Sequence, residues 1–154
     1  MRDALGNLLP HEHQQFGTGT VDPLLQIGWL TPLSERWRGD LYAAAHLPLY
    51  ENGNGYRAPR EFTVAGGITQ SLNAHWHLCG SLLGTYSGYA EWDEARYINS
   101  GWYVGDAGLA AEYRTEAATW SLSIQAPFGQ QTLGEGDETF ELGWVMSLGV
   151  AIQL

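Results

Sequence analysis

The sequence closes on Phe140-Glu141-Leu142-Gly143-Trp144-Val145-Met146-Ser147-Leu148-Gly149-Val150-Ala151-Ile152-Gln153-Leu154, in which every second residue from Phe140 onward is apolar. The residues between them are mostly small or polar. Because side chains along a β-strand alternate between two faces, this pattern predicts one strand with a long apolar face and a small, mixed face. At about 3.3 Å per residue, such a strand is long enough to cross a tilted bilayer.

The same alternation recurs along the rest of the chain. The further strands that it predicts are 21–33, 36–50, 60–70, 75–87, 101–114 and 119–128. In 36–50, for example, Trp37 and Leu41 share the apolar face, whereas Arg38, Asp40 and Tyr42 share the other. We therefore predict an all-β, antiparallel, up-and-down arrangement of about seven strands over residues 21–154, preceded by an irregular segment, residues 1–20.

Composition limits the class of protein. With 154 residues, 44% of them apolar, and 20 glycines, the chain fits a single β-rich domain with many turns. The net charge of -10 argues against a nucleic-acid partner and against a surface that grips anionic lipid. The single cysteine, Cys79, cannot form a disulfide within the chain. No stretch approaches the roughly 18 consecutive apolar residues of a transmembrane helix, whereas barrel strands alternate and give weak hydropathy.

The connections between the predicted strands alternate in length. Those near Ser34, Asn73 and Glu116 are short, and those at 51–59, 88–100 and 129–139 are long. Membrane barrels have short periplasmic turns and longer extracellular loops, whereas a soluble sandwich has no reason to alternate. The pattern predicts a transmembrane barrel with its long loops, and residues 1–20, outside the cell.

Aromatic residues fall near the ends of the predicted strands, where interfacial girdles would lie. Those at the short-turn ends are Trp37, Trp76, Tyr113 and Trp120, and those near the long loops are Phe62, Tyr86, Tyr103, Phe128 and Phe140.

Two features suggest that the predicted barrel is larger than this chain. Seven is an odd count, and single-chain bacterial barrels have even strand numbers. The start, Met1-Arg2-Asp3-Ala4-Leu5, lacks the basic region and apolar run of a signal peptide. We therefore expect the chain to be the C-terminal part of a larger barrel, completed by a missing N-terminal half or by self-association.

The terminal strand resembles the C-terminal signature of bacterial outer-membrane barrels, although that signature usually ends in Phe and here ends in Leu154. Further motifs resemble a family of outer-membrane proteins named after the meta-pathway of phenol degradation and described as transporters. They are Gln15-Phe16-Gly17-Thr18-Gly19-Thr20-Val21-Asp22-Pro23, Asn52-Gly53-Asn54-Gly55-Tyr56, Asn99-Ser100-Gly101 and Gln125-Ala126-Pro127-Phe128-Gly129-Gln130. The similarity covers roughly residues 10–154, the family's C-terminal half. It implies outer-membrane location and passage of small, often aromatic compounds, and it supplies no catalytic residues.

Charged and polar side chains on the predicted inward face are the candidate lumen lining. They are Arg38, Asp40, Tyr42, His46, Asp106, Glu112 and Arg114. In a channel or transporter for small solutes these groups would set selectivity, and the excess of acids predicts a mild preference for cations or neutral solutes.

Three alternatives share the alternating pattern. A lipocalin-like soluble barrel would turn the apolar face inward around a ligand. A structural barrel of the outer membrane would be filled by its own side chains and transport nothing. An enzyme would need a catalytic group at one rim, but the sequence has no Gly-x-Ser-x-Gly nucleophile context, and mixed inward charges are usual in a water-filled lumen. We predict no catalytic activity.

A metal site is the main alternative role for polar residues of the inward face. His75, His77 and Cys79 share one face at alternate positions, and these residue types suit zinc or copper. Neighbours on one face of a strand are about 7 Å apart, so an ion would need a ligand from another strand. His11 and His13 lie in a loop on the opposite side of the predicted membrane. We read these residues as polar lining or loop and predict no metal or cofactor.

Overall fold

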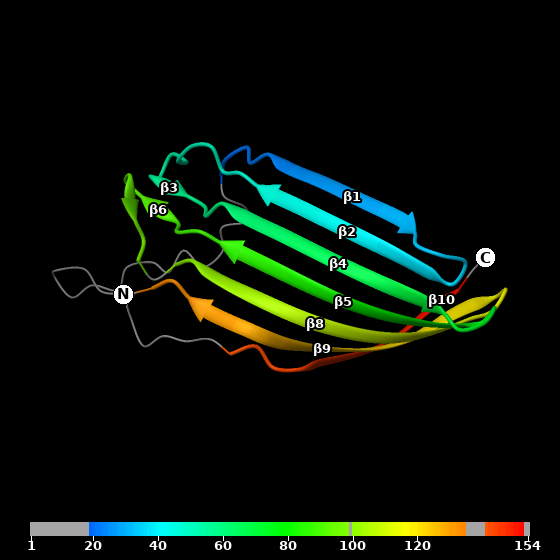
Figure 1. Cartoon of the computed structure of the whole chain (residues 1–154). Helices are drawn as coiled ribbons and strands as arrows, with labels where there is room; N and C mark the ends of the chain where they lie inside the picture. Colours follow the sequence, from blue (N-terminus) through cyan, green and yellow to red (C-terminus); the bar gives the residue numbers. More distant parts are fainter. Residues whose placement is uncertain (1–18, 99, 135–140, 153–154) are drawn as a thin grey trace.

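The computed structural model describes residues 19–98, 100–134 and 141–152. Seven strands form one antiparallel sheet in which each strand pairs with its neighbours in chain order (Figure 1). The strands are β1 (Leu24–Pro32), β2 (Trp37–His46), β4 (Glu61–Ser71), β5 (Trp76–Ser87), β8 (Trp102–Arg114), β9 (Ala118–Thr132) and β10 (Val145–Ile152). The prediction of an all-β chain with a seven-stranded antiparallel sheet is confirmed.

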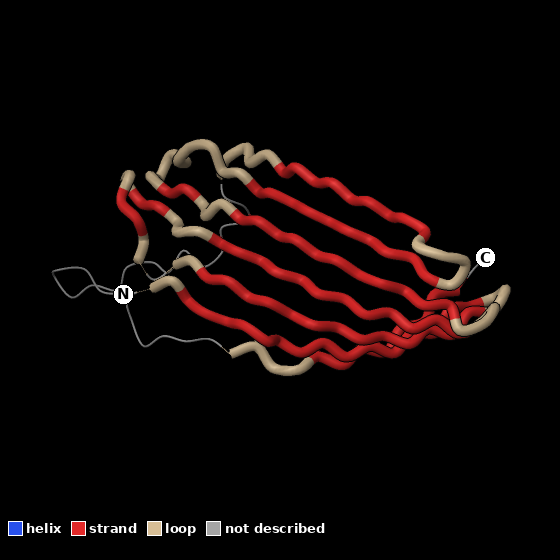
Figure 2. The backbone as a smooth tube through the Cα atoms, in the orientation of Figure 1, coloured by secondary structure: helices blue, strands red, loops and turns tan. Residues whose placement is uncertain are grey.

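The sheet is a single curved layer (Figure 2). β1 and β10 stand at the two ends of the strand order, and within the described residues they do not pair with each other. The sheet of this chain is therefore open. Within the same residues, no helix is long and apolar enough to cross a membrane.

β2, β9 and β10 differ most from their predicted bounds. β2 ends at His46, four residues before the predicted end at residue 50. β9 continues past Pro127 because a bulge leaves Phe128 without a partner and moves the ladder from Asp106–Pro127 to Gly105–Gly129. β10 begins at Val145, after the predicted start at residue 140, because a side chain takes the hydrogen bonds of the backbone just before it. The Gln130 amide accepts from the Leu142 N–H at 2.6 Å and donates to the Leu142 carbonyl at 3.0 Å. Residues 140, 153 and 154 lie outside the described residues.

Each short turn is held by a polar side chain that accepts backbone N–H groups. Asn73 Oδ1 accepts from His75 and Trp76, both at 2.9 Å. Ser34 Oγ accepts from Trp37 at 3.2 Å, and Thr115 Oγ1 accepts from Ala118 at 3.0 Å. These local bonds satisfy donors that the tight turn leaves outside the ladder, so the turns need no longer connection.

The long connections contain structure that the sequence did not predict. β3 (Tyr56–Arg57), β6 (Glu91–Trp92) and β7 (Ala95–Arg96) form a small three-stranded sheet beside the main one (Figure 1). Arg57 pairs with Glu91, and the rings of Tyr56 and Trp92 lie 5.0 Å apart. The predicted loops 51–59 and 88–100 therefore pack on each other.

Hardly any apolar side chain is buried. Among the described residues, the buried apolar side chains are Pro48, Ala58, Ala90 and Val104, all near the long connections. In contrast, Leu82 is 59% exposed and Leu148 is 78% exposed. Burial of apolar surface is the main favourable contribution to folding, and the described residues leave most of this apolar face uncovered.

Candidate functional site

The register divides the sheet into an apolar face and a polar face. Opposite residues of an antiparallel ladder point to the same side, so each row of partners belongs to one face. Across the middle, the row on the apolar face is Leu41–Gly66–Leu82–Ala107–Ala126. The adjacent row on the polar face is Asp40–Gly67–Ser81–Gly108–Gln125. The alternation predicted from the sequence therefore holds across five consecutive strands of the sheet, from β2 to β9.

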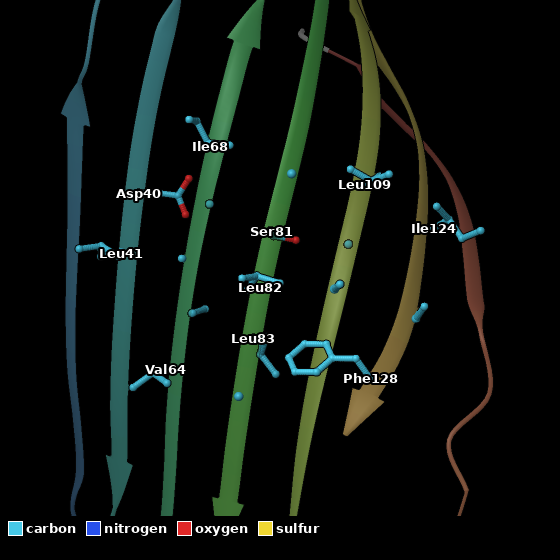
Figure 3. A pocket seen from close by; sticks show the side chains of 18 of the residues that line it. Asp40, Leu41, Val64, Ile68, Ser81, Leu82, Leu83, Leu109, Ile124 and Phe128 are labelled. Atoms are coloured by element: carbon cyan, nitrogen blue, oxygen red, sulfur yellow. The ribbon is translucent and has the colours of Figure 1, made fainter. Parts of the chain in front are cut away.

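A hollow of about 1050 Å³ lies over this middle region and is lined mostly by apolar-face residues (Figure 3). Its walls include Leu41, Leu109 and Phe128, and its floor includes glycines such as Gly66. The hollow has this shape because glycine positions between large side chains leave space above the sheet.

All seven predicted lumen residues lie on the polar face, but they do not meet in one cluster. Arg38 lies in the row of Thr69 and Cys79, near the short turns, and Glu112 and Arg114 lie at the same end on β8. The middle holds Asp40, Tyr42 and Asp106, and the end near the long connections holds His46. The residues thus form three levels along the strands.

The short-turn level is mainly basic. Arg38, Arg114 and His77 line a hollow of about 320 Å³. Arg114 pairs with Glu112 on the same strand, its Nε lying 3.0 Å from Glu112 Oε2. Ser71, which the sequence reading assigned to a turn, ends β4 and its Oγ lies 3.0 Å from His77 Nδ1. Continuing the alternation by one step beyond Thr69 would have placed Ser71 on this face.

The middle level carries two carboxylates that are far apart. Asp40 lies on β2 and Asp106 lies on β8, which is three strands away. With about 4.8 Å between neighbouring strands, their backbones are about 14 Å apart when the distance is followed along the sheet. Tyr42 and Asp106 share a row through Ala65 and Leu83.

Asp40 is positioned by a glycine on the next strand. A Cβ built on Gly67 would lie 2.7 Å from each carboxylate oxygen of Asp40. The carboxylate therefore extends sideways over β4 rather than straight away from the sheet, which only a residue without a side chain at position 67 allows.

The level near the long connections is a network that sequence reasoning mostly missed. His46 Nε2 lies 3.6 Å from Asp22 Oδ2, and Thr20 Oγ1 donates to Asp22 Oδ1 at 2.6 Å. The buried Ser87 donates to Glu61 Oε1 at 3.1 Å. The alternation of the predicted strand 60–70 puts Glu61 on the polar face, but nothing in the sequence assigns it a role.

Tyr56 links this network to the small sheet. Partial burial raises the pKa of Tyr56 above 10.0, and the nearby carboxylates of Asp22 and Glu61 raise it further. No sequence signal indicated this residue, because its neighbours come from distant segments.

The histidines and the cysteine of β5 have separate partners. His75 Nδ1 lies 2.9 Å from the Arg114 carbonyl oxygen, His77 contacts Ser71, and Thr69 donates to Cys79 Sγ at 3.5 Å. Within the part of the chain that the structure describes, no group of three His, Cys, Asp or Glu side chains could hold a metal ion. His11 and His13 lie outside that part.

Aromatic side chains form two rows on the apolar face. Near the short turns, Trp76, Tyr113 and Trp120 are register partners, and the rings of Trp76 and Tyr113 are 5.0 Å apart. At the other end, the partners are Phe62, Tyr86 and Tyr103. Trp37 and Phe128 lie closer to the middle, and Phe140 is outside the described residues.

Two strands carry one aromatic residue of each row, and the spacing between the rows is the same on both. It is ten residues from Trp76 to Tyr86 on β5 and ten from Tyr103 to Tyr113 on β8.

Comparison with known proteins gives no relative: no protein-family model, no curated protein and no solved structure matches this chain.

Proposed function

We propose that this sheet is part of a transmembrane β-barrel of a cell outer membrane and that it passes small solutes. The observation that carries the proposal is the pair of aromatic rows on the exposed apolar face. Ten residues of strand span about 33 Å, and a tilt of about 40° reduces this to about 25 Å along the membrane normal. That height equals the apolar band of outer-membrane barrels, which aromatic girdles flank on both sides.

The sizes of the side chains support the same orientation. In the middle rows of β4, β5 and β8, the polar face carries Gly67, Ser81 and Gly108, and the apolar face carries Gly66, Leu82 and Ala107. The inside of a closed sheet has less room than the outside, so the small residues favour the polar face as the inner one. In a lipocalin-like soluble barrel the faces would be reversed, and tryptophans would crowd the interior.

The solute path would run along the polar face through its three levels. A solute from outside would pass the Asp22 and Glu61 carboxylates, then Asp40 and Asp106, and reach Arg38 and Arg114 last. Acidic groups in the first two levels favour small neutral or cationic solutes. The resemblance to the phenol meta-pathway family adds small aromatic compounds to this class. We propose no catalytic role for these residues.

Conductance in planar bilayers tests the proposal. The protein is purified in detergent from outer membranes, together with whatever closes its sheet, and the reversal potential is measured across a KCl gradient. We expect cation preference, and we expect it to fall in the variant Asp40→Asn/Asp106→Asn, because both carboxylates face the path. Glu116→Gln is the matched control, since Glu116 is exposed in a short turn away from the path.

Three results would contradict the proposal. Anion preference would show that the acidic levels do not control the path. Absence of both conductance and solute uptake would favour the structural barrel. A monodisperse monomer that stays soluble without detergent would reject the membrane location.

A further inference from the structure

The two outer strands of the sheet have unprotected edges. β1 (Leu24–Pro32) contains no charged residue, and neither does β10 (Val145–Ile152). Within the described residues each pairs with a single neighbour, and Ile27 of β1 is 71% exposed. Natural sheets usually protect such edges with charges, prolines or bulges, because a free edge recruits other strands. The only such device here is Pro32, at the last position of β1. Both edges are therefore suited to pairing with further strands.

The free edges run in the same direction. β1 starts at Leu24, opposite His46 at the end near the long connections, and runs to the short turn at 33–36. β10 starts at Val145, opposite Gln125, and runs to Ile152, opposite Ala118 beside the short turn at 115–117. This follows from the count, since the first and last strands of an antiparallel meander with an odd number of strands are parallel to each other.

We infer that both edges are completed by antiparallel strands of one polypeptide segment that has an odd number of strands and is not a second copy of this sheet. The inference rests on the proposed function, because it assumes closure in a membrane. A segment that pairs antiparallel with both edges must begin and end with strands running from the short turns towards the long connections. Only an odd number of strands meets both conditions, and seven plus an odd number gives the even total of bacterial barrels.

A second copy of this sheet meets the conditions poorly. If both copies have the same orientation in the membrane, β10 of one lies beside β1 of the other, and both seams are parallel. Parallel pairing is less stable per residue, and a barrel of this kind is otherwise antiparallel. If one copy is inverted, the seams become antiparallel, but the long connections then lie on both sides of the membrane. That contradicts the one-sided placement of long loops in outer-membrane barrels.

The segment must also continue both faces. At the edges, the apolar face presents Leu25, Ile27 and Trp29 on β1 and Met146, Leu148 and Val150 on β10. The outer strands of the segment therefore need apolar residues at alternate positions on the lipid side. On the other side they meet Gln26 and Gly28 of β1 and Ser147 and Gly149 of β10, so small or polar residues fit there.

Photo-cross-linking reads both the identity and the direction of the neighbouring strand. A benzophenone side chain is placed singly at Leu25, Ile27, Trp29, Met146, Leu148 and Val150 in the full chain, expressed in its native host. The benzophenone suits these positions because each is apolar and at least 48% exposed. Leu82, on the same face of the central strand β5, is the control and should cross-link to lipid but not to another polypeptide. Cross-linked residues are identified by mass spectrometry after membrane fractionation.

We expect one and the same polypeptide segment, distinct from residues 19–152, at both edges. As the probe moves from Leu25 to Trp29 and from Met146 to Val150, the residue number of the cross-linked position in that segment should fall, because the pairing is antiparallel. Three results would overturn the inference. They are peptides that join β1 of one copy to β10 of another, partner residue numbers that rise as the probe moves along the strand, and no polypeptide cross-link at either edge.

The outcomes also separate the inference from the proposed function. A chain that stays with the membrane but forms β1–β10 cross-links between copies refutes the odd-numbered segment and leaves the membrane barrel intact. A chain recovered in the soluble fraction refutes the proposed function itself.

Discussion

The two faces of the sheet differ in side-chain size as well as in polarity. Where β2 presents Leu41 on the apolar face, the adjacent position presents Asp40, whose carboxylate lies over Gly67 (Figure 3). On β8, Gly108 leaves room for Ser81, since a Cβ there would lie 2.6 Å from the serine oxygen. Glycines of the polar face thus accommodate functional groups of the next strand, whereas the apolar face carries large side chains that touch little protein. Among the described residues, the polar face makes contacts within the chain, and the apolar face leaves its large side chains exposed.

The largest expected effect comes from placing a charge on each face at neighbouring positions of β5. Leu82 shares the apolar row of Leu41, and Leu83 shares the polar row of Tyr42 and Asp106. Leu82 lies near the midpoint between the aromatic rows, so Leu82→Arg should cost about 2–4 kcal/mol of unfolding free energy in lipid vesicles. Leu83→Arg would place its charge in the water-filled lumen and should cost less than about 1 kcal/mol.

Urea titration of the closed assembly in vesicles, followed by tryptophan fluorescence, measures both variants. Equal losses would mean that the faces do not differ in solvent. A larger loss for Leu83→Arg would mean that the apolar face lies in water, which would contradict our proposal.

Adjacent glycines of β4 provide a smaller contrast. A Cβ at Gly67 would lie 2.7 Å from the Asp40 carboxylate oxygens, whereas one at Gly66 would lie 3.3 Å from Leu41 Cδ2. We expect Gly67→Ala to cost about 1 kcal/mol and to change cation selectivity, because Asp40 must move. Gly66→Ala should be neutral or stabilise by up to about 1 kcal/mol, because the Leu41 methyl can yield and the unfolded chain loses freedom.

A second substitution checks the cause. Asp40→Ala in the Gly67→Ala background should recover the lost stability, since it removes the group that the new methyl displaces. If stability is not recovered, the cost lies in the backbone of β4 and not in the contact with Asp40.

Much of the main sheet could be predicted from the period of two. In β4 and β5, the alternation placed the strand bounds within one residue. In β2 and β8, it put Arg38, Asp40 and Glu112 on one face. Turn positions such as Asn73 were also visible, because the residue that holds each short turn lies within it. These features depend on neighbours in sequence, and local patterns report them.

The rest depends on contacts between distant segments. β3 and β6 pair Tyr56 with Trp92, and no alternation marks strands of two residues. The bond from Ser87 to Glu61 crosses from β5 to β4, and the register that joins them emerges only when the strands pair. The predicted strand 119–128 stops four residues before the end of β9 at Thr132, because the ladder beyond Pro127 depends on a bulge that forms against Gly105 on another strand.

The smallest expected effect tests how the polar face ends at the long connections. Partial burial and the carboxylates of Asp22 and Glu61 raise the pKa of Tyr56 above 10.0 in the folded protein. Well below pH 10 the phenol is protonated in both the folded and the unfolded state, so its full contribution to stability is present and does not change with pH. As the pH rises from 10 through the folded pKa, the unfolded state ionises first, so stability is lost over that interval. Absorbance of the phenolate at alkaline pH, with the fluorescence of the neighbouring Trp92, should show late ionisation of Tyr56 and opening of the small sheet. Tyr56→Phe should abolish this transition, and Asp22→Asn should move it to lower pH, because it removes one of the charges that hold the proton. If Asp22→Asn leaves the transition in place, the Asp22 carboxylate does not act on Tyr56, and the polar face does not extend electrostatically into the small sheet.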